Sequence, residues 1–91
     1  MKLIWTQTSL SDLKHIYAYI SEDNVMAAKN TLAKIKKSSH HIRKYPQIGK
    51  KGRIEETKEF IVPNSFYIII YREKKDVIEI LSILHATRKW P

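Results

Sequence analysis

The residues of this sequence with the clearest acid–base potential stand near its C-terminal end. His85 follows an apolar run, and Arg88 lies three residues further along. A histidine in that position could serve as a general acid or base, and an arginine could neutralise phosphate charge. The alternative is that His85 ends a strand and hydrogen-bonds the backbone. We therefore treat His85 and Arg88 as candidate catalytic residues, with this alternative left open.

No second catalytic or metal-binding group of residues accompanies them. The sequence has no cysteine, and His40 and His41 are adjacent rather than four apart, as two ligands on one helical face would be. It also lacks a carboxylate pair, a Ser/His/Asp order, a nucleotide-binding fingerprint and the GxxxxGK[ST] pattern of a P-loop. We expect no metal and no cofactor, and the residues alone make a weak case for catalysis.

Positive charge is the stronger signal. The sequence holds 17 Lys and Arg against 9 Asp and Glu, for a net charge of +8. Such a field favours an anionic partner, which could be nucleic acid, a phosphate-rich assembly or an acidic protein. A basic surface can also serve solubility alone. Nine of the cations fall between Lys29 and Arg53, a stretch that contains no acid.

These cations divide between a predicted helix and a predicted loop. Spacings of 3, 4 and 3 place Lys34, Lys37, His41 and Lys44 on one helical face, which could also be an ordinary solvated surface. The loop, residues 47–57, holds both glycines of the chain, and these would let its backbone approach a phosphate. The candidates for binding a phosphate or a target are Lys50, Lys51, Arg53, Arg72, Arg88 and Trp90.

The elements that must position these residues are organised around a predicted β-hairpin. Two runs rich in β-branched and aromatic residues, Phe66–Tyr71 and Val77–Leu84, flank the polar segment Arg72–Asp76. Because this segment lacks Asn-Gly or Asp-Gly, we expect a loop longer than two residues. The consecutive isoleucines at 68–70 leave no polar face, which predicts a central strand covered on both sides.

The rest of the chain predicts two helices and two further strands. Ser9 with Asp12 resembles a capping box and would start a helix over residues 10–21. Asp23 or Asn24 would cap a second helix, which Pro46 ends near Lys44. Residues 3–5 suit an edge strand and residues 58–62 a further strand.

This order, β-α-α-β-β-β, predicts a two-layer α+β fold with a mainly antiparallel sheet and an N-terminal helical hairpin on one face. We expect a single domain over residues 1–91. The start of the sequence lacks the apolar run of a signal peptide, and no segment approaches the roughly 20 apolar residues of a membrane span. Together with the lack of cysteine, these features predict a cytoplasmic protein without membrane contact.

Several short motifs, in their order and spacing, resemble the RelE/ParE toxins of type II toxin–antitoxin modules. The resemblance runs from Trp5 to Trp90. The residues that carry it are Trp5, Thr8, Asp12-Leu13, Ile16, Tyr19-Ile20, Ala27-Ala28, Ile35, Pro46, Gly49, Lys58-Glu59-Phe60, Tyr67–Tyr71, Asp76–Ile80, Ile83–His85, Arg88 and Trp90. The family usually has Arg where this chain has Lys58.

The resemblance implies the same fold and a cognate antitoxin whose toxin-binding segment is acidic. Such a segment would meet the basic surface, and the residues assigned to it are Lys34, Lys37, Lys44 and Lys58. A homodimer through the helical hairpin or a hetero-oligomer with the antitoxin is a further expectation.

The resemblance also implies two mechanisms. ParE-like members poison DNA gyrase by binding it, whereas RelE-like members cut mRNA on the ribosome. Several nuclease members carry an Arg in the central strand three residues before its last Tyr, where this chain has Ile68, and many end in a catalytic His or Tyr, where this chain ends Trp90-Pro91. These departures favour a ParE-like growth inhibitor with gyrase as its target. The alternative is a ribosome-dependent endoribonuclease that uses Lys50, Lys51, Arg53, His85 and Arg88.

Overall fold

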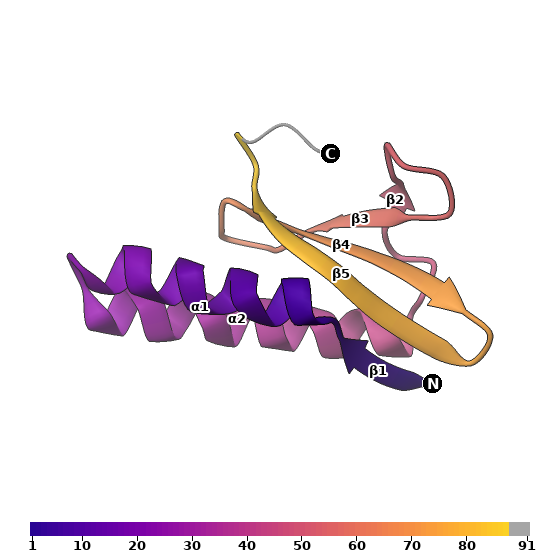
Figure 1. Cartoon of the computed structure of the whole chain (residues 1–91), viewed down its shortest axis with the longest axis horizontal. Coiled ribbons are helices and arrows are strands. Elements are labelled where there is room, and N and C mark those ends of the chain that lie inside the picture. Colours follow the sequence, from indigo (N-terminus) through magenta and orange to yellow (C-terminus); the bar gives the residue numbers. More distant parts are fainter. Residues whose placement is uncertain (88–91) are drawn as a thin grey trace.

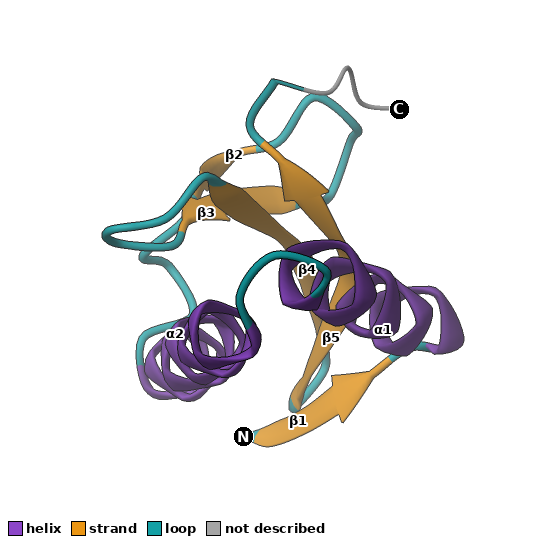
Figure 2. Cartoon of the chain, turned by 90° about the vertical axis from the view of Figure 1, so that its left-hand side faces the viewer, coloured by secondary structure: helices purple, strands orange, loops and turns teal. Residues whose placement is uncertain are grey.

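A five-stranded sheet carries both helices on one side (Figures 1 and 2). The computed structural model describes residues 1–87. Its elements are β1 (Lys2–Trp5), α1 (Gln7–Ser21), α2 (Val25–Lys44), β2 (Lys50–Lys51), β3 (Lys58–Ile61), β4 (Tyr67–Lys74) and β5 (Val77–His85). The strand order is β1-β5-β4-β3-β2. The predicted α+β architecture is confirmed, including the paired helices and β1 at one edge of the sheet. The sequence did not predict that β1 pairs parallel with β5.

One strand was not predicted. Residues 47–57 do not form a loop throughout, because Lys50–Lys51 pairs antiparallel with Lys58 and Glu59 as the outer strand β2. Two residues are too few to show the alternation by which a strand is recognised in a sequence. The pairing is therefore a product of the tertiary structure, in which β3 offers a free edge to the chain returning from α2.

The expected long loop of the hairpin is wrong. β4 continues past its apolar part to Lys74, which pairs with Val77 across a turn of only two residues, Lys75 and Asp76. Lys75 takes a φ of 56°, a conformation that Gly or Asn adopts more readily. An ion pair across the strands, Arg72 Nε to Glu79 Oε1 at 2.6 Å, supports this polar extension. Cross-strand pairing has here overridden the turn preference of the sequence.

The start of α1 also differs from the prediction. Thr6, not Ser9, is the N-cap: its Oγ1 accepts from the Ser9 amide at 3.2 Å and donates to the Ile80 carbonyl at 2.8 Å. Asp12 completes no capping box. Its Oδ2 accepts from the Ser82 hydroxyl at 2.7 Å and from the Ile83 amide at 2.9 Å. Because β1 pairs with β5 only as far as Ile80, Asp12 supplies the acceptor that the β5 edge needs beyond it.

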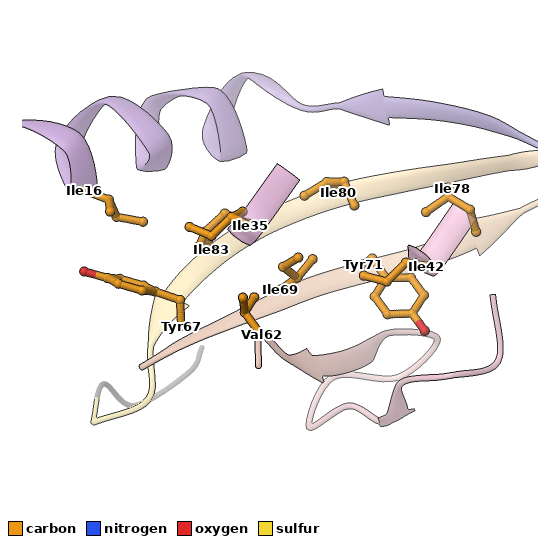
Figure 3. Packing of buried hydrophobic residues seen from close by; sticks show 10 residues of the cluster. All are labelled: Ile16, Ile35, Ile42, Val62, Tyr67, Ile69, Tyr71, Ile78, Ile80 and Ile83. Atoms are coloured by element: carbon orange, nitrogen blue, oxygen red, sulfur yellow. The ribbon is translucent and has the colours of Figure 1, made fainter. Parts of the chain in front are cut away.

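The second helix follows its prediction. Asn24 is the N-cap, accepting from the Ala27 amide at 3.0 Å, and α2 ends at Lys44 before Pro46. Both helices pack on one sheet face through Ile16, Ile35 and Ile42 (Figure 3).

A register shift in the β4–β5 ladder shapes this core. Ile70 pairs with Ser82 but Tyr71 pairs with Ile80, so Leu81 is an extra residue on β5. The shift lets Ile80 and Ile83, three residues apart, join the same cluster. β4 occupies the centre of the sheet with residues 67–71 all buried, which confirms the central strand predicted from its consecutive isoleucines.

Candidate partner-binding surfaces

A basic groove lies between α2 and β3. Its cavity measures about 520 Å³, and its walls include Phe60 and Pro63. The cationic and titratable residues that line it are Lys34, Lys37, His40, His41 and Lys44. The predicted helical face of Lys34, Lys37, His41 and Lys44 is thereby confirmed as one surface. Of the four residues assigned to the antitoxin, three lie here, and Lys58 lies elsewhere.

The fold explains why these side chains meet. The buried stripe of α2, which includes Ile35 and Ile42, faces the sheet, so the lysines beside that stripe stand over the outer part of β3. Lys34 Nζ donates to the Asn64 carbonyl at 2.9 Å and ties α2 to the β3–β4 turn. His41 lies edge-on to Tyr45, with ring centroids 5.2 Å apart, and 6.4 Å from the Phe60 ring. A row of cations beside an aromatic wall suits an amphipathic acidic segment.

A second basic cavity of about 590 Å³ lies beside the turn of the β4–β5 hairpin. Its cations are Lys51, Lys58, Arg72, Lys74 and Lys75, and its acids are Glu56 and Glu73. Of the predicted phosphate-binding residues that fall within residues 1–87, Lys51 and Arg72 line it. Lys74 and Lys75 were not singled out from the sequence. A recognisable two-residue turn after Lys74 would have placed both lysines at the end of the hairpin. The turn residues Lys75 and Asp76 do not match the Asn-Gly or Asp-Gly by which such a turn is recognised.

The remaining predicted cations of the loop have other surroundings. Lys50 is exposed on β2 outside both cavities. Arg53 lies against buried Glu59: its Nε is 3.4 Å from Glu59 Oε2, and its backbone amide donates to the same oxygen at 3.1 Å. Arg53 therefore holds the loop onto β3.

The two glycines serve packing rather than an approach to phosphate. The Gly49 amide donates to Tyr71 Oη at 2.9 Å, and the Gly52 amide donates to the Thr57 carbonyl at 2.8 Å. Tyr71 Oη in turn donates to the Pro46 carbonyl at 2.8 Å, so one buried hydroxyl joins the end of α2, the loop and β4. With both glycine amides used inside the chain, the expected backbone contact with a phosphate has no free donor at these two positions.

Burial raises the pKa of Tyr71 above its ordinary value of 10.0, against the lowering effect of the Gly49 hydrogen bond; the charge of Glu73 raises it further. Folding therefore favours the neutral phenol of Tyr71. The contribution of this group to folding stability is fully present below pH 10, the ordinary pKa, and is lost as the pH rises above it. We expect urea unfolding between about pH 8 and 11 to show the stability advantage of the wild type over Tyr71→Phe shrinking above pH 10. An advantage that stays constant across this range would contradict the assignment.

His85 stands apart from both cavities. Its Nδ1 accepts from the Thr87 amide at 3.2 Å and lies 2.8 Å from Thr87 Oγ1, which matches the alternative of a strand-end His bonded to the backbone. Its ring stacks on Phe66 with centroids 5.8 Å apart. In the β4–β5 ladder His85 pairs with Tyr67. Tyr67 and Arg72 are five residues apart on β4, which corresponds to about 17 Å at about 3.3 Å per residue. The structure thus separates His85 from Arg72.

Two predicted site residues come after residue 87. Arg88 and Trp90 lie outside the described residues. Ile68, at the position where nuclease relatives carry Arg, is buried on β4 and pairs with Leu84. Among residues 1–87 no group of three His, Cys, Asp or Glu side chains could hold a metal ion.

Comparison with known proteins shows the family of this chain. Residues 3–90 match the family model described as the ParE toxin of the type II toxin–antitoxin system parDE. The chain belongs to the ParE toxin family. As a ParE-like toxin of a type II toxin–antitoxin module, it has an antitoxin as its partner. The resemblance seen in its motifs is confirmed.

One curated relative is similar in sequence, and two solved structures are similar in fold. The candidate toxin Y4kP of Sinorhizobium fredii is 39% identical over 90 residues, which cover 99% of this chain and 93% of Y4kP. The fold is shared with a solved chromosomal ParDE system of P. aeruginosa, with a TM-score of 0.85, 20% identity, and 93% and 95% of the two chains covered. The isolated E. coli RelE toxin is similar with a TM-score of 0.66, 17% identity, and 97% and 86% covered. Within the described part of this ParE-family chain, no helix is both long and apolar enough to span a membrane.

Proposed function

We propose that this ParE-family toxin inhibits growth by binding DNA gyrase in the cytoplasm, without cutting RNA. The observation that carries the proposal is the match of residues 3–90 to the ParE family model. The surroundings of His85 support it, because general acid–base catalysis on RNA would need this side chain within hydrogen-bond reach of the same substrate that the cations hold. About 17 Å along β4 separates His85 from the position of Arg72. Ile68 offers no donor or charge between them.

We further propose that the acidic segment of the antitoxin occupies the basic groove between α2 and β3. Lys34, Lys37 and Lys44 would meet its carboxylates, while Phe60 and Pro63 would receive its apolar side chains. Lys58, the fourth residue assigned to the antitoxin from the sequence, lines the other cavity and is not required by this proposal.

Purified toxin added to two reconstituted reactions would test the function. We expect it to inhibit DNA supercoiling by gyrase and to leave mRNA on translating ribosomes intact. His85→Ala combined with Arg88→Ala should retain antitoxin binding, because the contacts proposed for the antitoxin are the groove residues Lys34, Lys37 and Lys44. Cells that express the toxin alone should form filaments as DNA replication fails.

The competing RelE-like mechanism gives opposite results. Cleavage of ribosome-bound mRNA that is lost in the His85→Ala/Arg88→Ala variant, with gyrase unaffected, would show a ribosome-dependent endoribonuclease. A toxin without effect in both reactions would contradict the proposed function as well.

A further inference from the structure

The second basic cavity differs in kind from the antitoxin groove. The groove has an aromatic and a proline wall, whereas among residues 1–87 no aromatic or large aliphatic side chain lines the second cavity. Protein partners bind mainly through buried apolar and aromatic anchors, so a cavity of charged and small polar side chains is poorly suited to a peptide. It suits a hydrophilic polyanion. Its five cations outnumber its two acids, Glu56 and Glu73.

Two of these cations face one another at a cost in stability. In the β2–β3 ladder Lys51 pairs directly with Lys58, and like charges in opposed positions destabilise a sheet. Among the described residues neither lysine has an ion pair. An anion bound between them would remove this repulsion.

The turn beside them carries a second unfavourable choice. Lys75 holds a positive φ of 56°, where Gly, Asn or Asp would be less strained. The charge of the neighbouring Lys74 is likewise not paired with an acid among the described residues. Lysine thus stands at two places around one cavity where it is locally unfavourable: opposite another lysine in the sheet, and in a backbone conformation with positive φ. Such locally unfavourable choices are typical of functional surfaces.

We propose that this cavity binds the phosphate backbone of duplex DNA. The inference rests on the proposed function in one respect, because gyrase acts on duplex DNA and a bound toxin would lie near that duplex. The lining also favours a duplex over a single strand. Single-stranded nucleic acids are held by stacking bases on aromatic side chains, and none of the described residues that line this cavity is aromatic. Contacts by lysine and arginine to phosphates alone bind without regard to sequence and weaken steeply with salt.

Fluorescence anisotropy with a labelled duplex of about 20 base pairs, at about 50 and 200 mM KCl, would test the proposal. Wild-type toxin should bind with a dissociation constant of order 1–100 μM that rises with salt. Lys51→Gln with Lys58→Gln should weaken binding about tenfold at the lower salt. It should also lower the slope of log Kd against log salt concentration by the amount expected for the loss of about two phosphate contacts. Lys74→Gln with Lys75→Asn, which keeps a residue suited to positive φ, should act similarly.

The control removes the same charge from elsewhere on the surface. Lys29→Gln with Lys36→Gln alters two exposed residues of α2 that line neither cavity, and should leave DNA binding within about twofold of the wild type. Equal losses in the control and the cavity variants would overturn the proposal, since net charge would then explain binding. Tighter binding of a single-stranded RNA of equal charge would overturn it too.

Gyrase supercoiling measured on the same proteins separates the two proposals. Gyrase inhibition by a toxin that does not bind the free duplex overturns the DNA site and leaves the proposed function standing. Duplex binding that the cavity variants lose, with gyrase unaffected, supports the DNA site and overturns the proposed function.

Discussion

Lys34→Glu combined with Lys37→Glu is expected to weaken antitoxin binding by about 100-fold, or about 3 kcal/mol. Both lysines line the groove between α2 and β3, and both are exposed near the middle of the helix, where neither terminus complicates the change. The change from lysine to glutamate at both positions replaces two charge attractions to an acidic segment with two charge repulsions inside one cavity. Isothermal titration with the cognate antitoxin measures the loss directly.

A matched control is available on the same helix. Lys29→Glu with Lys36→Glu makes the same change of charge at exposed positions outside the groove, and should cost less than about fivefold in affinity. The Lys34 change also removes its hydrogen bond to the Asn64 carbonyl, so Lys34→Gln measures that contribution separately. If the two reversals weakened binding equally, the groove would not be the antitoxin site.

Gly49→Ala is expected to cost about 3 kcal/mol of folding stability and to lower the Tm by on the order of 10–20 °C. A Cβ at this position would stand 2.6 Å from Tyr71 Oη, 2.8 Å from Tyr71 Cε1 and 3.0 Å from the Glu59 carbonyl. Tyr71 is fully buried, so its ring cannot move aside without disturbing the core and its bonds to Pro46 and Gly49. Space, not backbone conformation, demands the glycine, because no glycine of the described chain has a positive φ.

A double-mutant cycle tests that cause. Tyr71→Phe removes the oxygen nearest to the added methyl group, so Gly49→Ala should cost less in the Tyr71→Phe background than in the wild type. Thermal and urea unfolding of the four proteins gives the coupling. A Gly49→Ala protein within about 0.5 kcal/mol of the wild type, or costs that simply add, would contradict the steric explanation.

The sequence by itself determined those features that depend on nearby residues. The periodicity of α2, its Asn24 cap and its end before Pro46 are written within one segment, as are the consecutive isoleucines that place β4 at the centre of the sheet. The spacing of Lys34, Lys37 and Lys44 likewise fixed a common helical face before any partner strand was known. The order of motifs indicated the ParE-related family.

The tertiary structure decided how residues distant in sequence meet. It placed Lys51 opposite Lys58 in a second cavity, away from the lysines of α2. It also closed the hairpin at Lys75 against the local turn preference. It also gave Asp12 to the open edge of β5 instead of to a helix cap. Each outcome depends on which backbone groups and charges a sheet leaves without partners, and only the assembled sheet determines that.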